Sequence, residues 1–360
     1  MPSSPVRVLL IAPSIEILGG QAVQAAHIMK GFSSNPEIRM TMLPINPRLP
    51  GPLRWLQKVR FVRTIATFML YIPLLLWKAV SCDVMHVFSA SYYSYMLWTL
   101  PAILVGKVYR RKVILNYRDG RAEEHLKNWK TALPTIRLVD TIITPSGFLV
   151  DVFRKFGLKA TAIFDVVETD LFRYRRRGPL KPVFMTNRIL EPLYNVGCIL
   201  RAFAIIQNKY PEASLTIAHD GVCRPELEAL AKTLELSNTR FIGRVPREHV
   251  ADIYESAEIY LTSPNFDCMP GSLMECFVCG LPIVATNAGG IPYISADEVN
   301  ALLVPCNDHE AMAAAAMRLL EDPELAARLT TNGREEVKRY VWDRVRDQWL
   351  ALYRELVSNR

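Results

Sequence analysis

The sequence predicts an α/β protein built from two doubly wound domains. Short apolar stretches with the character of buried parallel strands alternate with amphipathic helices along most of the chain, and glycine turns follow several strands. The chain has 360 residues, of which 50% are hydrophobic and 22% are charged. This length is large for a single domain with one hydrophobic core and is typical of two domains. We predict a first domain over residues 1–165, a linker over 166–182 and a second domain over 183–340.

The first half opens with the order strand, glycine loop, helix that begins a doubly wound domain. A strand over residues 6–12 is followed by Gly19-Gly20 and a helix over 21–32, and no G-x-G-x-x-G fingerprint of dinucleotide-binding proteins is present. The further strands expected in this half cover residues 40–45, 83–89, 113–120, 142–146 and 162–165.

The second half repeats the alternation without a repeat in sequence. Its expected strands cover residues 183–186, 214–218, 240–242, 259–262, 283–286 and 301–305, and its helices cover 196–209, 225–234, 248–256, 308–321 and 323–332. A last helix over 341–357 has its apolar positions on one face, which predicts packing against another element.

The stretch 263–291 contains the most informative chemistry in the sequence. Asp267 and Glu275 flank a Pro270-Gly271-Ser272 turn, so we expect Ser272 to cap a helix that carries Glu275 in its first turn. The unpaired N–H groups of a helix N-terminus attract anions, and nearby carboxylates accept hydrogen bonds from hydroxyls. A ligand with both phosphate and sugar hydroxyls fits this combination.

This stretch resembles the E-x7-E region of the retaining glycosyltransferases of family 4. Asp267 takes the place of the first Glu, and the sequence also keeps the positions Glu275, Gly280, Pro282, Thr286, Gly289, Gly290 and Pro292. Similar fragments cover nearly the whole chain. The resemblance implies the GT-B fold, in which two Rossmann-like domains face each other across a cleft, with an acceptor domain first, a nucleotide-sugar donor domain second, and the last helix packed back on the first domain.

The resemblance also implies a set of site residues. Arg188 would grip the donor diphosphate, Asp267 the donor sugar and Glu275 the ribose, while Arg118 stands where the family usually has a histidine. Further donor contacts would come from Gly19, Gly20, Asn195, Val245, Met269, Gly271, Ser272 and Leu273. Three departures from the family are the neutral Asn195 at the usual lysine position, Pro270 where a backbone N–H is usual, and Arg118.

Several of these positions have simpler explanations that the sequence leaves open. The Gly19-Gly20 pair is also compatible with a plain turn, and Arg118 with an ion pair to Asp119 or Glu123. Asn195 is also compatible with an N-cap whose helix supplies the missing positive charge.

The charge is distributed unevenly. The chain has a net charge of +8, and residues 1–177 hold 25 Lys and Arg against 11 Asp and Glu. No nucleic-acid-binding motif accompanies this excess, which favours anionic lipid or phosphate as the partner.

Residues 53–80 begin basic and end in a 14-residue apolar run, shorter than the roughly 20 residues that span a bilayer. They are either a core helix or an interfacial helix on an anionic membrane. The arginine-rich run 173–177 is expected to be a solvated linker.

The cysteines and acids predict neither a disulfide framework nor a metal site. Seven cysteines, an odd number, occur without a signal peptide, which favours a cytoplasmic protein, and Cys276-x-x-Cys279 has no second pair or nearby histidine, so we expect buried thiols. No Asp-x-Asp tripeptide occurs, which argues against a metal-bridged diphosphate. We expect no cofactor apart from the nucleoside-diphosphate sugar used as co-substrate.

The predicted function is transfer of a hexose, with retention, from a nucleoside-diphosphate sugar to a lipid-linked or polysaccharide acceptor at the cytoplasmic face of the membrane. Two alternatives remain open at this point. One is a catalytically silent GT-B protein that binds a nucleotide or a partner enzyme, and the other is a nucleotide-sugar epimerase on the same scaffold.

Overall fold

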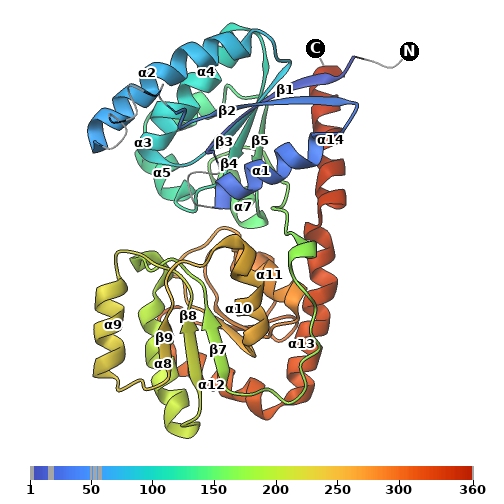
Figure 1. The fold of residues 1–360 in the computed structure, drawn as a ribbon. Coiled ribbons are helices and arrows are strands. Elements are labelled where there is room, and N and C mark those ends of the chain that lie inside the picture. The colour runs from blue at the N-terminus through green and yellow to red at the C-terminus, as the bar shows by residue number, and fades with distance from the viewer. Residues whose placement is uncertain (1–3, 15–19, 49–50, 52–54, 56–58, 359–360) are drawn as a thin grey trace. The chain divides into compact units, whose positions relative to one another are not determined.

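A computed structural model describes residues 4–14, 20–48, 51, 55 and 59–358, and it divides the chain into two compact units (Figure 1). Unit 1 comprises Met1–Val166 and Trp342–Arg360, and unit 2 comprises Val167–Val341. Residues 167–182, predicted as a separate linker, thus group with the second unit.

The described residues of unit 1 form a parallel six-stranded sheet with the order β2-β1-β3-β4-β5-β6. The strands are β1 (Val6–Ala12), β2 (Ile38–Pro44), β3 (Val84–Ser89), β4 (Lys112–Tyr117), β5 (Thr141–Thr144) and β6 (Ala160–Ala162). The helical elements are α1 (Gly20–Phe32), α2 (Arg60–Ala79), α3 (Tyr92–Ser94), the π-helical turn η2 (Tyr95–Thr99), α4 (Leu100–Val108), α5 (Ala122–Asn128), α6 (Ala132–Ile136), α7 (Gly147–Lys155) and α14 (Trp342–Ser358).

The core of unit 1 is completed by the last helix of the chain. Helix α14 packs on α1, β1 and β3, and its apolar face buries Val345, Trp349 and Tyr353. The helix predicted over 341–357 therefore forms, and it lies on the first unit (Figure 1). Beneath it, His86 on β3 is fully buried, 4.5 Å from the Trp349 ring and 2.8 Å from the Tyr353 hydroxyl through Nδ1.

Helix α2 is longer than the apolar run suggested. It has 20 residues and includes Pro73, and its Val62–Ala79 part is long and apolar enough to cross a membrane by length and composition. One face, with Thr67, Tyr71 and Leu75, is buried against unit 1. The opposite face is exposed, so α2 packs on the core of unit 1 with one side only.

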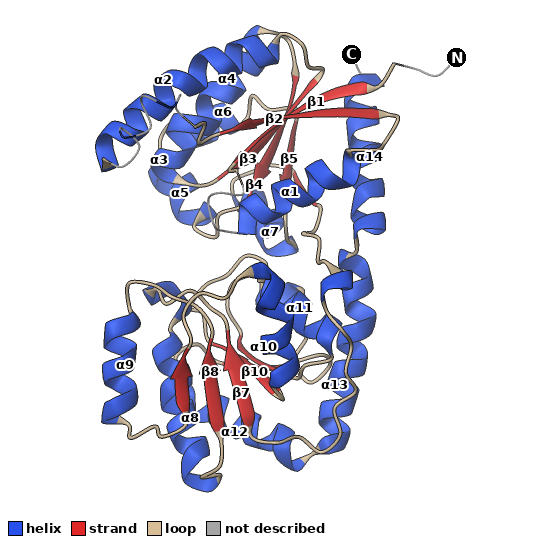
Figure 2. Cartoon of the chain, viewed as in Figure 1, coloured by secondary structure: helices blue, strands red, loops and turns tan. Residues whose placement is uncertain are grey.

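The described residues of unit 2 form a second parallel six-stranded sheet with the order β12-β11-β10-β7-β8-β9 (Figure 2). The strands are β7 (Val183–Thr186), β8 (Ser214–Ile217), β9 (Thr239–Phe241), β10 (Ile259–Thr262), β11 (Ile283–Thr286) and β12 (Leu302–Val304). The α-helices are α8 (Val196–Lys209), α9 (Arg224–Thr233), α10 (Val250–Ser256), α11 (Gly271–Cys279), α12 (His309–Glu321) and α13 (Pro323–Glu336). Short 3-10 turns are η3 (Thr169–Leu171), η4 (Pro192–Tyr194), η5 (Arg247–His249), η6 (Ile291–Tyr293) and η7 (Val337–Tyr340). The predicted fold class, two doubly wound α/β domains, is confirmed.

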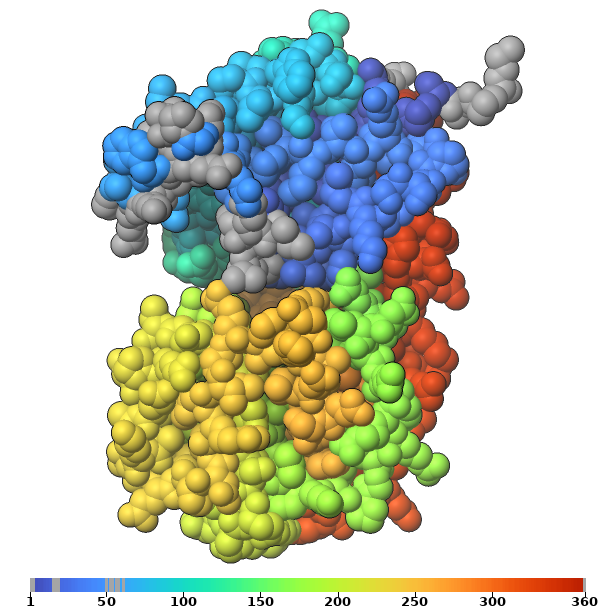
Figure 3. Space-filling model, viewed as in Figure 1, coloured from blue at the N-terminus to red at the C-terminus, as the bar shows by residue number. Residues whose placement is uncertain are grey.

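The arginine-rich run 173–177, expected to be a solvated linker, is solvated only in part, because Arg173 and Arg176 are exposed and Arg177 is not. The Arg177 side chain is only 2% exposed, and its guanidinium donates to the carbonyls of Cys279 and Gly280, each at 2.7 Å, and to Tyr254 O at 3.0 Å. These carbonyls lie at the C-terminal ends of α11 and α10, where backbone acceptors lack helical partners. Arg177 therefore caps two helices and fastens this segment to unit 2. In the space-filling view the green surface that follows unit 1 in the colour order lies against the rest of unit 2 (Figure 3).

Candidate functional site

Two loops of unit 2 meet where the strand order of its sheet reverses. Strand β7 is flanked by β8 on one side and by β10 on the other, and ligands of doubly wound folds bind at the carboxyl ends of strands beside such a switch point. The loop after β7 carries Arg188 and the loop after β10 carries Asp267. The loops are tied together, because Asn265 N donates to Leu193 O at 2.9 Å and Ser263 Oγ donates to Asn195 O at 2.8 Å.

Arg188 and Asp267, predicted separately from two motifs, form a direct ion pair. Their side chains are only 11% and 13% exposed. The Arg188 guanidinium also donates to Ser272 Oγ at 3.3 Å and lies over the Tyr194 ring, 4.3 Å from its centroid. Burial is the largest influence and would lower the pKa of Arg188, but the Asp267 carboxylate, with smaller contributions from nearby tyrosines, raises that pKa overall. Arg188 thus stays a cation at any physiological pH.

The glycine turn predicted after β11 holds the Asp267 loop in place. Gly289 has a left-handed φ of 55°, and Gly290 N donates to Asp267 O at 2.7 Å. A methyl group on Gly290 would overlap the carbonyl oxygen of Cys268. The close approach of the two backbones therefore requires glycine at both positions, and the hydrogen bond from Gly290 holds the backbone of the Asp267 loop in place.

Helix α11 begins differently from the prediction. It starts at Gly271 with Pro270 in the N-cap position, and Ser272 lies inside the first turn. Ser272 makes no capping hydrogen bond and accepts from Arg188 instead. Glu275 consequently falls in the second turn. The expectations that Ser272 caps the helix and that Glu275 lies in its first turn were both wrong, because the helix begins at Gly271, two residues earlier than a Ser272 cap would require. Pro270 at the N-cap offers no side-chain acceptor, so the first amides of the helix have no side-chain cap.

Glu275 is bound by two side chains of neighbouring elements. The Tyr254 hydroxyl donates to Glu275 Oε2 at 2.6 Å, and Arg247 lies 3.4 Å from Oε1 while its other nitrogen bonds Glu168 at 2.8 Å. Burial raises the pKa of Glu275 above its usual value, and the hydrogen bonds from Tyr254 and Arg247 only partly offset this. Because a half-buried carboxylate has too few hydrogen-bond donors to replace its lost water, it is suited to accepting hydrogen bonds from ligand hydroxyls.

A buried network around Asn187 escaped the sequence analysis. The Asn187 amide bonds the hydroxyls of Tyr254 and Tyr260, both at 2.8 Å, and the two tyrosine rings stack with centroids 6.1 Å apart. Through this network Asn187, which directly precedes Arg188, is linked to Tyr254, which in turn donates to Glu275. The signals in the sequence were the polar residue directly after a buried strand and two tyrosines in otherwise apolar elements, and neither is specific.

Asn195 directly precedes helix α8, which is the N-cap position, but its side chain makes no hydrogen bond to the first amides of the helix. It adopts left-handed φ and ψ values of 45° and 44°, and its amide donates to Asn307 Oδ1 at 2.8 Å. Asn195 is therefore the N-cap residue of α8 by position, as one alternative expected, but without the side-chain hydrogen bond of a usual cap.

The other predicted donor contacts of unit 2 surround the same helix start. Met269 and Leu273 have buried side chains, and the exposed Gly271 is the first residue of α11. Their contribution to a ligand would come through backbone atoms. Val245 lies half-buried in the loop after β9.

In unit 1, Gly19 lies outside the described residues, and Gly20 is the exposed first residue of α1. Arg118 pairs with Asp165, not with Asp119 or Glu123, and lies 4.9 Å from the centroid of the Phe88 ring. The expected ion-pair partners were wrong because the segment after β6 returns to the edge where β4 ends.

Within the part of the chain that the structure describes, no cluster of three or more His, Cys, Asp or Glu side chains is arranged to hold a metal ion. Cys276 and Cys279 are buried free thiols, as expected. Burial raises the pKa of Cys279 to about 12, so this thiol is unreactive.

Comparison with known proteins matches residues 169–336 to the family "Glycosyl transferases group 1". A D-inositol 3-phosphate glycosyltransferase from Saccharomonospora viridis is 30% identical over 47% of this chain and 42% of its own length. A phosphatidyl-myo-inositol mannosyltransferase from Mycolicibacterium smegmatis is 30% identical over 51% of this chain and 47% of its own length. The chain thus spans under half the length of these two curated relatives.

Solved structures extend the likeness to the whole fold. A sucrose-phosphate synthase from Thermosynechococcus elongatus has a TM-score of 0.77 at 18% identity, covering 99% of this chain and 100% of that one. HepE from Anabaena, solved in complex with UDP, has a TM-score of 0.75 at 14% identity, covering 97% and 100%. The fold of these structures agrees with the predicted GT-B fold. Arg188, Asp267 and Glu275 all lie within residues 169–336, the part of the chain that matches the glycosyl transferases group 1 model.

Proposed function

We propose that this protein is a retaining glycosyltransferase that moves a hexose from a nucleoside-diphosphate sugar to a lipid-linked or polysaccharide acceptor. The observation that carries the proposal is the meeting of Arg188, Asp267, Glu275 and the start of α11 at one edge of the unit 2 sheet. A cation and unpaired backbone N–H groups suit a diphosphate, and a buried carboxylate suits ribose hydroxyls. HepE, whose fold is similar, binds UDP, which supports a nucleotide in this unit.

In this proposal the diphosphate leaves toward Arg188 and the first amides of α11. The bond between the anomeric carbon and the diphosphate oxygen breaks, the bond to the acceptor oxygen forms on the same face, and the departing phosphate takes the acceptor proton. Preorganised positive charge at the leaving group accelerates such a step. Asp267, already bonded to Arg188, holds that guanidinium in position and retains a second oxygen for a sugar hydroxyl.

We propose that the diphosphate needs no bound metal ion, since Arg188 is a permanent cation and the chain has no Asp-x-Asp tripeptide. The neutral Asn195, bonded to Asn307, would leave the N-terminus of α8 as a second source of positive potential.

The acceptor side of the proposal draws on unit 1. Two relatives are named for acceptors that carry a phosphate ester, D-inositol 3-phosphate and phosphatidyl-myo-inositol. The basic first half of the chain and the exposed apolar face of α2 support an anionic membrane surface as a partner, at the cytoplasmic face of the membrane. No nucleic acid is expected to bind.

Calorimetric titration of UDP, GDP, ADP and their sugars tests the donor assignment. We expect one nucleotide family to bind, and Glu275→Ala to weaken it. A sugar product transferred to an acceptor with the anomeric configuration retained would support the enzyme. Binding of the nucleotide without hydrolysis or transfer would favour the silent GT-B protein, and conversion of the donor sugar without an acceptor would favour the epimerase.

A further inference from the structure

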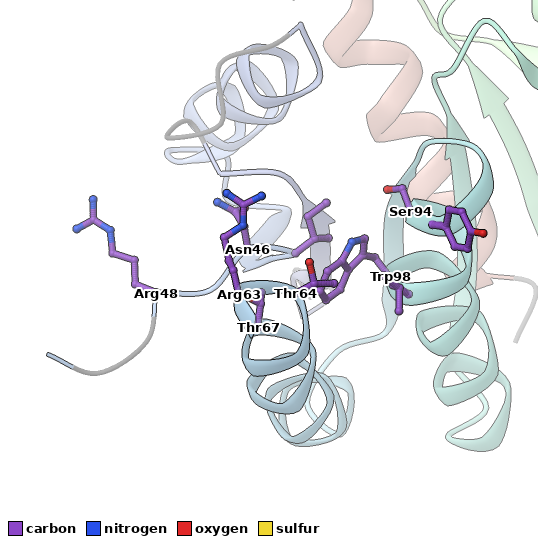
Figure 4. A pocket seen from close by; sticks show the side chains of 10 residues that line it. Asn46, Arg48, Arg63, Thr64, Thr67, Ser94 and Trp98 are labelled. Carbon is purple, nitrogen blue, oxygen red and sulfur yellow. The ribbon is translucent and has the colours of Figure 1, made fainter. Parts of the chain in front are cut away.

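Unit 1 contains a cavity of about 530 Å³ that the donor chemistry does not use. Its walls are the loop after β2, the first turns of α2 and the segment from Tyr93 to Trp98. Figure 4 shows Arg63 beside Asn46, with the Trp98 ring turned toward Thr64 and Thr67. The loop wall is fixed, because Ser14 N donates to Asn46 Oδ1 at 2.9 Å and the Asn46 amide donates to Ser14 Oγ at 2.7 Å.

The wall that carries Trp98 has an irregular backbone. Tyr92 has a left-handed φ of 56°, and Tyr95–Thr99 form a π-helical turn. A non-glycine residue in the left-handed region of φ and ψ destabilises the backbone by on the order of 1–3 kcal/mol. Left-handed residues and π-helical turns both occur preferentially at binding sites. The Trp98 ring is nevertheless held firmly: the Tyr71 ring meets it edge-on at 5.2 Å, and the Tyr71 hydroxyl donates to Trp98 O at 2.8 Å. The cavity thus presents a pre-positioned aromatic ring.

The charged groups that line the cavity are two cations. Arg48 and Arg63 belong to the lining, and the lining includes no Asp or Glu. Among the described residues, no hydrogen bond or ion pair holds the Arg63 guanidinium, in contrast to Arg118 and Arg188, which have carboxylate partners. A cation in a cavity with hydroxyl and amide groups is suited to the oxygens of a phosphate ester, and an indole ring to the face of a polyol.

An apolar stripe begins at the same turn of α2 as Arg63. Seven exposed residues at helical spacing form it, and all are apolar: Val62, Ile65, Met69, Pro73, Leu76, Trp77 and Val80. Ile65, Met69 and Trp77 are 62%, 70% and 71% exposed. Helix α4 packs beside α2 and adds the exposed Leu104 and Val108. Exposed apolar residues aligned along one face of a helix in this way mark a protein or membrane contact.

We propose that the cavity binds the phosphate ester of a lipid-linked acceptor, with the phosphate at Arg63, the polyol against Trp98 and the hydrocarbon chain along the α2 stripe. The inference rests on the proposed function and narrows it. A polysaccharide has no hydrocarbon to cover the stripe, and a soluble phosphate ester would leave it exposed, so a cationic cavity that opens beside an apolar stripe favours an amphiphile.

The test measures binding of the full chain to vesicles of phosphatidylcholine alone and with added phosphatidylinositol, and to inositol 1-phosphate in solution. We expect binding to the phosphatidylinositol vesicles, weakened about fivefold by Arg63→Gln. Arg137→Gln is the matched control, because Arg137 is another exposed arginine of unit 1 that lies outside the cavity lining. Equal weakening by both variants would indicate unspecific charge attraction and overturn the assignment.

A second pair of variants tests the stripe. Met69→Glu should weaken vesicle binding strongly and leave inositol 1-phosphate binding unchanged, whereas Val222→Glu, at an exposed valine of unit 2, should change neither. Lipids with brominated chains should quench tryptophan fluorescence less in Trp77→Phe than in the unchanged protein. If inositol 1-phosphate binds as tightly as the vesicles and Met69→Glu has no effect, the acceptor is soluble and the lipid assignment is wrong.

Nucleotide binding separates this inference from the proposed function. Intact nucleotide binding together with indifference to both phosphate probes would overturn only the cavity assignment. Loss of every nucleotide interaction in the unchanged protein would instead remove the donor chemistry on which the inference rests.

Discussion

The Arg188–Asp267 ion pair allows catalytic and structural roles to be separated by a double-mutant cycle. The cycle compares Arg188→Ala, Asp267→Ala and the double variant. Each single change leaves one buried charge without its partner, since the side chains are only 11% and 13% exposed. Breaking a buried pair on one side typically costs about 3–5 kcal/mol of unfolding free energy.

The double variant should regain much of this stability, because neither charge remains. Contacting charged residues typically show coupling energies of up to about 3 kcal/mol, and we expect a value near that limit. Turnover should behave differently. If Arg188 stabilises the departing diphosphate, its removal lowers kcat by roughly 10²–10³, and removal of Asp267 does not restore it.

Urea unfolding at neutral pH gives the stabilities, and the rate of sugar release or transfer from the nucleotide sugar gives turnover. Arg188→Lys is the control that keeps the charge but loses the two-pronged geometry. The reasoning would be refuted if the double variant regained turnover together with stability. In that case Arg188 would serve only to neutralise Asp267.

Three further outcomes are expected. Glu275→Gln should bind nucleotide more weakly yet be no less stable at neutral pH, because burial raises the pKa of Glu275 and the amide removes a buried charge; calorimetry and urea unfolding check this. Arg177→Leu should lower the free energy of unfolding by about 2–4 kcal/mol, since it leaves several helix-end carbonyls unpaired, and unchanged stability would contradict the capping role. Burial lowers the pKa of His86 to about 3 and of His125 to about 4, so the unfolded chain binds protons first as the pH falls below 6.5. Stability should therefore fall between about pH 6.5 and 4, by up to ~1.4 kcal/mol per pH unit for each histidine. His86→Gln should flatten that slope, as urea unfolding at several pH values would show.

Much of the fold follows from the sequence because its strands are nearly continuous apolar runs between turn residues. Strand β1 and strand β11 have the predicted bounds, and α1 begins one residue earlier than expected. Helix α2 lies within the stretch 53–80 that was expected to be a core or interfacial helix, and it begins at Arg60. Basic residues do not interrupt a helix, so composition could not mark where α2 begins.

The site could be predicted in its residues but not in its contacts. The motifs identified Arg188, Asp267 and Glu275, yet none indicated that Arg188 and Asp267 would pair. Such a contact depends on β10 lying beside β7, which is a property of strand order and not of local sequence. The same limit explains Arg177, whose charge suggested solvent. Its acceptors lie some 80 to 100 residues later in the chain.

Helix α14 has a consequence for how the chain is synthesised. Residues 4–166 leave the ribosome before unit 2, but the surface of β1 and β3 that Trp349 and Tyr353 cover stays bare until residues 342–358 have also been made. Unit 2, which is contiguous, can complete its own core earlier. Unit 1 can thus complete its core only after unit 2 has been synthesised, and in that interval its uncovered apolar surface is exposed to aggregation and to chaperones.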